Sequence, residues 1–243
     1  MFGAYFYTLF CLFQLAGCRK LEDLLRSNQS ICRIQKITTT DIGGRTGVFQ
    51  YDKYGNPVSI SFTNYNEQSP DYLFRYDKKH RLTDCIGLIN NHVFYTFWHK
   101  YKYNDYGQII KDSVYRDGSF SEDPSPIGHG NLLTAYTYDS KERIIKALTY
   151  SQNTLVNQQT FAYDQKGNLV RPGLGYDNKL NIRATNKIWM FIDKDYSLNN
   201  PIPAVAYNAF ELPLKFNSSA NKEPVFFFLN SVLDKSDIEY YCK

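Results

Sequence analysis

The stretch FQYDKYGNPVSI, residues 49–60, combines an aromatic residue, a Tyr-Asp pair, a glycine and a β-branched run. Residues two apart on a strand share a face, so Phe49 and Tyr51 point to one side of a predicted strand. The Asp52 side chain can accept hydrogen bonds from the backbone amides of a turn. Gly55 supplies the positive φ that leads the chain into a second strand. The stretch therefore predicts strand, tight turn, strand.

This unit recurs along the chain as an apolar or aromatic residue, any residue, and then Tyr followed by Asp or Asn. The seven copies are centred on Tyr51-Asp52, Tyr76-Asp77, Tyr103-Asn104, Tyr138-Asp139, Tyr163-Asp164, Tyr176-Asp177 and Tyr207-Asn208. A recurring unit of this kind is the signature of a repeat architecture. We expect an all-β chain: an antiparallel meander of hairpin repeats in one long, twisted sheet that curls into an open roll.

The fourth position after the tyrosine is not always glycine. It is occupied by Gly55, Gly107 and Gly167 in three copies and by His80, Glu142, Leu180 and Glu211 in the others. A left-handed backbone at His80, Glu142 or Leu180 would cost about 1 kcal/mol. We therefore expect a different turn type in those copies.

Composition favours a sheet over a helical bundle. Aromatic residues make up 16% of the chain, with 21 Tyr and 17 Phe, and tyrosine suits a half-buried sheet face. The net charge of +4 comes from 28 basic and 24 acidic residues that are scattered along the chain. Proteins that bind nucleic acids usually carry a clustered basic stripe, so we expect no nucleic-acid partner.

The N-terminus has the character of a targeting segment. Residues 1–17 carry no charged side chain and are interpreted as a signal peptide. They are followed by Cys18, and Leu15-Ala16-Gly17-Cys18 resembles the lipobox of bacterial lipoproteins, in which the cysteine is lipidated. The usual Lys or Arg before the apolar run is missing, and a plain signal peptide or a buried strand is the alternative. We expect a lipid-anchored tether over residues 18–30 and a repeat domain over 31–243.

Three cysteines fall in the expected repeat domain: Cys32, Cys85 and Cys242. An exported compartment permits disulfides. Cys32 begins the first strand-like segment and Cys242 ends the last, so neighbouring terminal strands could carry a Cys32–Cys242 bridge. Three separate thiols are the alternative, because sequence does not determine connectivity.

The repeated units resemble YD (Rhs-type) repeats. Together with the lipobox, they make the chain similar to YD-repeat-like lipoproteins of unknown function from Bacteroidetes-type bacteria. The resemblance covers roughly residues 31–242. It implies a place in the cell envelope as an outer-membrane lipoprotein, on either the periplasmic or the surface side. Large Rhs proteins use many more copies to enclose a toxin, so encapsulation is not implied here.

No catalytic signature is present. The histidines are His80, His92, His99 and His129, and no nucleophile-elbow, zinc-protease or phosphate-loop spacing occurs. His129 lies in the Pro/Gly/Ser-rich segment 116–131, which we interpret as a long loop. A metal bound by the repeat Asp and Asn residues is a weaker explanation than turn capping. We therefore expect no metal, no cofactor and no enzymatic activity, with a hydrolase using the 116–131 loop as the less favoured alternative.

Exposed aromatic residues offer the best candidate binding surface. Phe94, Trp98, Tyr106 and Trp189 could contact a glycan or a protein, with core packing as the alternative for each. The all-apolar run 188–192 is interpreted as a buried helix or strand. We expect a non-enzymatic envelope lipoprotein that acts as a binding or interaction module. A structural or assembly accessory of an envelope or secretion system is the alternative.

Overall fold

The structure is a computed structural model that describes residues 32–39, 44–63, 70–121, 123, 126–173, 175–217, 227–229 and 231–243. The expected signal peptide, the lipobox with Cys18 and the tether lie outside these residues. The strands before the helices are β1 (Cys32–Thr39), β2 (Thr46–Tyr51), β3 (Pro57–Phe62), β4 (Asp71–Tyr76), β5 (Leu82–Ile89), β6 (Phe94–Tyr103), β7 (Ile109–Ser119), β8 (Ile127–Tyr138), β9 (Ile144–Ser151) and β10 (Thr154–Thr160). The 3-10 helix η1 (Ile182–Thr185), the helix α2 (Lys187–Asp193) and the strands β11 (Ala206–Tyr207), β12 (Pro213–Asn217), β13 (Phe227–Phe228), β14 (Ser231–Val232) and β15 (Lys235–Cys242) follow.

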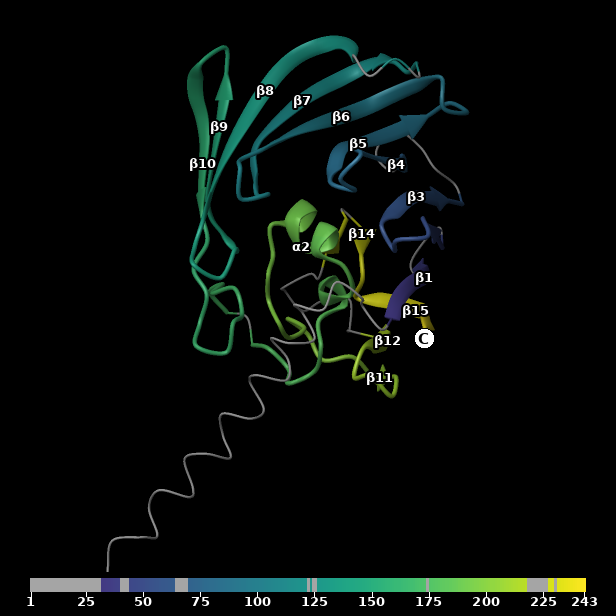
Figure 1. Ribbon diagram of the computed structural model, residues 1–243. Helices are drawn as coiled ribbons and strands as arrows, with labels where there is room; N and C mark the ends of the chain where they lie inside the picture. Colours follow the sequence, from purple (N-terminus) through teal and green to yellow (C-terminus); the bar gives the residue numbers. More distant parts are fainter. Residues whose placement is uncertain are drawn as a thin grey trace, which may run out of the picture.

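The predicted antiparallel meander is confirmed. Thirteen strands form one sheet in the order β10-β9-β8-β7-β6-β5-β4-β3-β2-β1-β15-β12-β11, so each of the first ten strands lies beside its sequence neighbour. The last long strand, β15, returns beside β1 and pairs with it from Cys32↔Cys242 to Thr39↔Ser236. Strands β13 and β14 form a separate small pair. The sheet is an open roll with β10 and β11 at its two edges (Figure 1).

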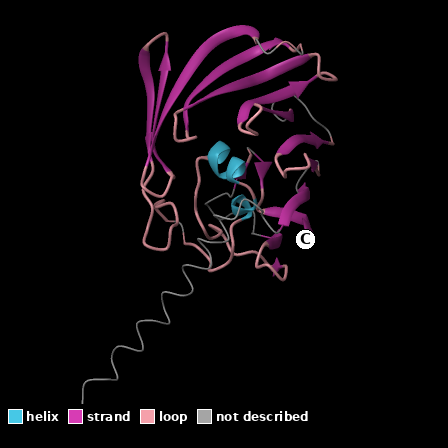
Figure 2. Cartoon of the chain, in the orientation of Figure 1, coloured by secondary structure: helices cyan, strands magenta, loops and turns pink. Residues whose placement is uncertain are grey.

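The sheet curls around a segment of its own chain. Figures 1 and 2 show α2 inside the curl, with strands on several sides of it. Trp189 of α2 is fully buried, and its ring lies 5.8 Å from that of Phe49 and 5.7 Å from that of Phe74. Phe191 of the same helix packs against two further sheet residues: its ring centre lies 5.2 Å from that of Tyr101 and 5.4 Å from that of Tyr136. These four sheet residues stand two positions before the tyrosine in the first four repeat units, so the repeat builds the wall of the core.

The helix is short, and capping and contact with the sheet hold it in place. The Asn186 side chain accepts a hydrogen bond from the Ile188 N–H at 2.9 Å and forms the N-cap. At the other end Lys194 is left-handed and its N–H reaches the carbonyls of Met190 and Phe191. The Asn186 side chain also donates to the Gly55 carbonyl at 3.2 Å, which ties the helix to the first repeat turn. The run 188–192 is therefore a buried helix, one of the two expected alternatives.

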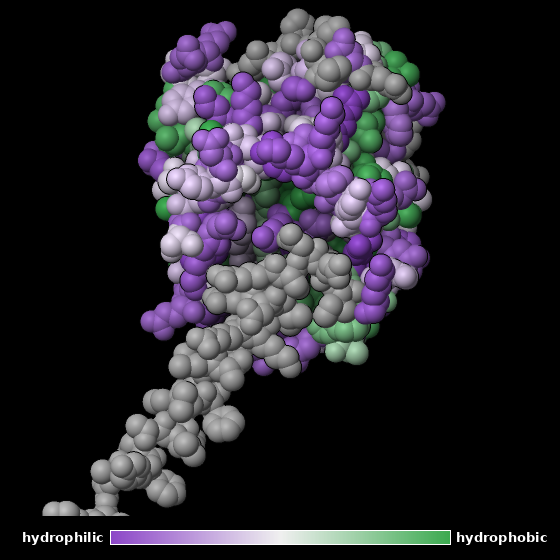
Figure 3. All heavy atoms as spheres, in the orientation of Figure 1, coloured by the Kyte–Doolittle hydropathy of each residue, from purple (hydrophilic) through white to green (hydrophobic). Residues whose placement is uncertain are grey.

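The inner face of the curl is apolar and the visible outer surface is mostly polar. Buried side chains from the strands, α2 and the C-terminal segment form one continuous cluster. Figure 3 shows hydrophilic residues over most of the face turned to the viewer, with hydrophobic ones in its recessed centre. None of the helices in the part of the chain that the structure describes is long and apolar enough to cross a membrane.

Candidate functional site

The repeat turns share one geometry. In the first copy the Asp52 N–H donates to the Asn56 carbonyl at 2.9 Å, and the Gly55 N–H donates to the Asp52 carbonyl at 3.0 Å. The Asp52 side chain accepts from the N–H groups of Tyr54 at 2.8 Å and Asn56 at 2.9 Å. The backbone pattern repeats at Asp77, Asn104, Asp139, Asp164 and Asn208. The motif residue is therefore a turn cap in these copies, whether it is Asp or Asn.

The expectation of a different turn type at His80 and Glu142 is wrong. Both residues are left-handed, with φ of 59° and 61°, and their turns make the same backbone hydrogen bonds as the Gly55 turn. Glu211 is also left-handed, with φ of 63°, and its turn makes the same backbone bonds although leucine follows it. In the His80 and Glu142 copies the next residue is arginine. The Arg81 Nε donates to Asp77 at 2.8 Å and the Arg143 Nε to Asp139 at 2.9 Å.

The carboxylates of these turns accept hydrogen bonds from groups of their own turn. Burial alone would raise the pKa of Asp52, Asp77 and Asp139, but hydrogen bonds from backbone N–H groups and from Asn56, Arg81 and Arg143 outweigh it and lower each pKa. In the described part of the chain no group of three or more His, Cys, Asp or Glu side chains could hold a metal ion.

The tyrosines of the second to sixth repeat units form a ladder that links each of these units to the one before it, whereas the Tyr207 hydroxyl donates to the Asp177 carboxylate. The ladder consists of hydrogen bonds from a tyrosine hydroxyl to the carbonyl of the residue six positions after the preceding repeat tyrosine. The bonds are Tyr76 to Pro57 (2.6 Å), Tyr103 to Leu82 (2.8 Å), Tyr138 to Ile109 (2.7 Å), Tyr163 to Ile144 (3.4 Å) and Tyr176 to Leu169 (2.6 Å). Tyr240 continues the ladder by donating to the Pro213 carbonyl at 2.9 Å, although it belongs to no motif copy. Sequence reasoning missed Tyr240 because a Tyr-Tyr pair stands where Tyr-Asp was sought.

The sixth repeat unit is split, so the chain does not form the tight turn of the other copies at Leu180. The Asp177 N–H donates to the carbonyl of Asn200, and the Asn200 N–H returns to the Asp177 carboxylate, both at 3.0 Å. Asn200 thus takes the place that Asn56 has in the first turn, and a proline follows each of them. The intervening residues 178–199 include η1 and α2, so the core helix is an insertion into a repeat turn.

The four aromatic residues predicted as a binding surface do not form one. Trp98 and Trp189 are fully buried, while Phe94 is 42% and Tyr106 89% exposed. Trp189 is in the core inside the curl, and Trp98 belongs to a second buried cluster on the opposite face of β5 and β6. The Trp98 Nε1 donates to Asp84 at 2.6 Å, so even its polar atom is used internally. Alternation alone could not show that both faces of these strands are covered.

The segment 116–131 is not the long loop that we expected. Strand β7 continues to Ser119 and β8 begins at Ile127, so most of the segment lies in a β-hairpin. His129 is paired with Arg116 across the two strands through the backbone, and its side chain lies outside the described part of the chain. The Pro, Gly and Ser residues indicated a loop, but the pairing of β7 with β8 determined the structure.

A polar cluster on the inner face links β5 to β8. The His99 Nδ1 lies 2.9 Å from both carboxylate oxygens of Asp112, and the Tyr136 hydroxyl donates to one of them at 3.1 Å. Cys85 is paired with His99 across β5 and β6 and is buried. Burial, and then the charge of Asp112, raise the pKa of the Cys85 thiol, whereas a nucleophilic cysteine needs a lowered pKa. The cluster satisfies a buried carboxylate and does not activate this thiol.

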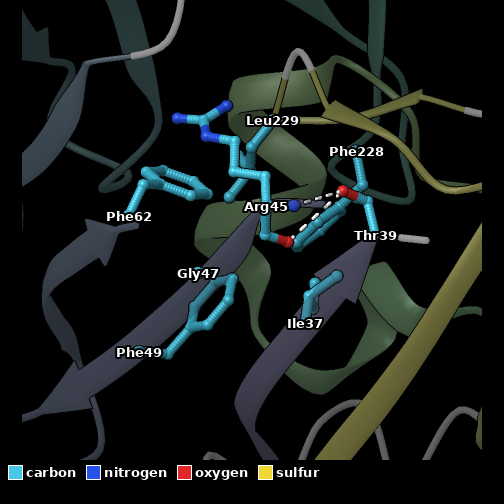
Figure 4. A pocket seen from close by; sticks show the side chains of 8 residues that line it. All are labelled: Ile37, Thr39, Arg45, Gly47, Phe49, Phe62, Phe228 and Leu229. Carbon is cyan, nitrogen blue, oxygen red and sulfur yellow. Dashed lines mark hydrogen bonds between the residues drawn. The ribbon is translucent and has the colours of Figure 1, made fainter. Parts of the chain in front are cut away.

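One pocket lies at the end of the curl, between β1, β2 and the β13–β14 pair (Figure 4). Its lining is mostly apolar, and the Arg45 guanidinium lies 3.5 Å above the ring centre of Phe62. The free volume is about 20 Å³, which is room for one water molecule. This pocket does not admit an organic ligand.

The two edges of the sheet differ. Edge strand β11 has two residues, and Pro201 and Pro203 precede it. Edge strand β10 has seven residues, TLVNQQT, and every one is exposed, including Leu155 and Val156. Proteins normally protect a long edge with charges, prolines or a covering element. Strand β10 has neither charge nor proline, but a β-bulge, which is another such device, interrupts it between Leu155 and Asn157. Beyond the bulge, residues 157–160 form a regular edge whose outer side pairs with none of the described strands.

The structure joins Cys32 and Cys242 in a disulfide, with an S–S distance of 2.04 Å and a sequence separation of 210 residues. The bridge connects the first residue of β1 to the last residue of β15. It therefore holds together the two strands that join the N-terminal meander to the C-terminal segment. Cys85 is a free, buried thiol.

No protein-family model matches the chain, and no curated protein matches it. Among solved structures, the crystal structure of TcdB2-TccC3-Cdc42 matches at 13% identity and a TM-score of 0.22, covering 55% of this chain and 9% of that one. The crystal structure of TcdB2-TccC3-TEV matches at 15% identity and a TM-score of 0.19, covering 54% and 10%. Scores this low carry no argument. The resemblance to YD-repeat proteins therefore rests on the repeated Tyr-Asp and Tyr-Asn units of the sequence.

Proposed function

We propose that the chain is a non-enzymatic interaction module of the cell envelope, anchored by a lipid on Cys18, which binds a protein partner through the open edge of β10. The observation that carries the proposal is the exposure of all seven residues of β10 in a strand without charge or proline. An extended segment of a partner can add to such an edge through main-chain hydrogen bonds, a common form of peptide recognition.

The filled interior supports this proposal over a small-ligand function. Helix α2 occupies the inside of the curl, where Trp189 contacts the sheet, and the pocket beside Arg45 has room for one water molecule. Glycan binding on stacked tryptophans is not favoured, because Trp98 and Trp189 are both buried.

A structural or assembly role in an envelope or secretion system is the second candidate. It would use the same edge, with the partner strand as a permanent part of the assembly. The disulfide favours such a role, because Cys32 and Cys242 fix the neighbouring strands β1 and β15 to each other and make the roll a more stable scaffold. The hydrolase alternative is less favoured, because most of the 116–131 segment lies in the hairpin of β7 and β8.

Site-specific crosslinking in cells of the natural host tests the proposal. A photo-reactive amino acid replaces Gln158 of β10 in the full chain, and Thr137, an exposed residue of the interior strand β8, is the matched control position. We expect a protein adduct at position 158 and none at 137. Equal labelling at both positions, or no adduct at 158, would contradict the proposal.

The anchor is tested separately. Cys18→Ser should release the protein from the membrane fraction, because it removes the sulfur that carries the lipid. Unchanged retention of the variant would refute the anchor without affecting the role of β10.

A further inference from the structure

We propose that the partner of β10 is a second copy of this chain, joined in antiparallel fashion around a two-fold axis near Gln158. The inference rests on the proposed function and specifies its partner. It follows from the direction of the free backbone groups, the chemistry of the central side chains and the absence of charge along the strand.

The free backbone groups can be assigned from the pairing of β10 with β9. Beyond the end of β10, the Phe161 N–H donates to the Ile145 carbonyl at 2.9 Å, so Phe161 faces β9. Backbone groups of successive residues on an antiparallel strand point alternately to its two sides. The N–H and C=O groups of Gln158 and Thr160 therefore point away from β9. They form a short row, on the regular part of the strand after the β-bulge between Leu155 and Asn157, to which one more strand can bond.

The hairpin that presents this row is well defined. Gln152 and Asn153 connect β9 to β10 as a two-residue turn with φ of 47° and 68°. Two successive residues with positive φ are typical of the type I′ turn, whose twist matches that of the flanking strands. Strand β10 therefore requires little ordering before it binds.

The side chains at the centre of β10 are self-complementary. Asn157, Gln158 and Gln159 carry amides, and each amide both donates and accepts hydrogen bonds. An antiparallel pair centred on Gln158 places this residue opposite its own copy and places Asn157 opposite Gln159. Ladders of paired amides of this kind stabilise sheets built from identical strands.

Electrostatics also permit a strand of the same sequence. No charged residue occurs from Ala147 to Tyr163, a stretch that contains all of β10 and its turn. A lysine at the two-fold axis would lie opposite its own copy, and like charges in that arrangement are destabilising. Self-pairing of β10 has no such cost. A charged partner strand would find no complementary charge on this edge.

A symmetric disulfide tests the pairing in the membrane. Gln158→Cys places one thiol of each copy at the axis, while Cys32 and Cys242 are bonded to each other and Cys85 is buried. We expect oxidation to convert the full-length variant to a covalent dimer that reductant reverses. Thr137→Cys, on the same sheet but away from the edge, is the control and should stay monomeric. A dimer yield no higher at 158 than at 137 would overturn the inference.

A charge exchange tests the same contact without covalent chemistry. Two differently tagged full-length copies are co-expressed, extracted in mild detergent and co-purified through one tag. Gln158→Lys in both copies, or Gln158→Glu in both, should reduce co-purification by about tenfold. One Lys copy with one Glu copy should restore it, which a misfolded variant could not do. Co-purification that is unaffected by like charges would overturn the inference.

The two levels of the proposal fail in distinguishable ways. If the photo-adduct at position 158 contains a different protein and never a second copy, the edge is a binding site but the two-fold pair is wrong. If position 158 gives no adduct with any protein, both are wrong. An adduct of two identical chains, together with the charge exchange, supports both.

Discussion

Asn200→Ala is the sharpest test of the split repeat unit. Asn200 is fully buried, and its Nδ2 donates to the Asp177 carboxylate at 3.0 Å and to the Leu180 carbonyl at 3.2 Å. Alanine keeps the backbone bonds of the turn and removes both side-chain bonds. A buried hydrogen bond to a charged group contributes roughly 1.5–3 kcal/mol and a neutral one roughly 0.5–1.5. We therefore expect the free energy of unfolding to fall by about 2–4 kcal/mol.

Asn56→Ala is the matched control, because Asn56 has the same role in an ordinary hairpin. Its Nδ2 donates to Asp52 at 3.0 Å, and the residue is half-buried. Only one side-chain bond is lost and water can replace part of it, so the expected loss is about 1 kcal/mol. The turn at Asn56 also joins two paired strands, which hold it without the amide.

Urea unfolding followed by far-UV circular dichroism measures both variants. The reasoning predicts a larger loss for Asn200→Ala, and a smaller effect of that substitution in an Asp177→Ala background, where its main partner is already missing. If Asn200→Ala costs no more than Asn56→Ala, the 178–199 segment is not held by a completed repeat turn. Full additivity of Asn200→Ala and Asp177→Ala would refute the direct pairing.

Three further predictions concern the core, the tyrosine ladder and the Cys32–Cys242 disulfide. Trp189→Ala should lower the free energy of unfolding by about 3–5 kcal/mol in urea titrations, because the indole is fully buried in the curl. Tyr103→Phe removes the hydroxyl bond to the Leu82 carbonyl and should cost about 1 kcal/mol. Burial raises the pKa of Tyr103 to about 12, so the folded state holds the phenol proton more tightly than the unfolded chain does. The contribution of this tyrosine to the free energy of unfolding is therefore complete below about pH 10 and is lost between about pH 10 and 12. Urea midpoints measured at rising pH follow this loss. Reduction of Cys32–Cys242 should lower the melting temperature, and Cys32→Ser should reproduce that shift.

Local chemistry was enough to predict the repeat and the class of fold. An aromatic residue and a tyrosine two apart on a strand must share a face, and Asp or Asn before a tight turn caps it. Phe49 therefore faces the core with α2, and Asp52 caps its turn. These inferences depend on residues that are close in sequence, where geometry leaves few alternatives.

Contacts between distant residues could not be predicted in the same way. The burial of Trp98 depends on Asp84, Arg75 and Phe120, which come from other strands or follow β7. The left-handed backbone at His80 was not predicted either, because its local cost of about 1 kcal/mol favours another turn type. The split of the sixth unit does have a signal in the sequence. Asn200 is followed by proline, as Asn56 is, and this Asn-Pro pair marks the second half of the split unit.

The open edge and the filled interior have one structural cause. A curled sheet built from this repeat presents a row of aromatic residues on its inner face, and that row must be covered. The chain meets this need by leaving the sheet after β10 and by inserting α2 into its sixth repeat unit, so that Trp189 and Phe191 reach the row. Had the fifth and sixth units continued the meander, they would have paired with β10 and protected it. The same departure that completes the core therefore leaves the outer side of β10 without a neighbour among the described strands. For this reason we propose the edge, and not the repeat motif, as the surface through which this chain recognises a partner.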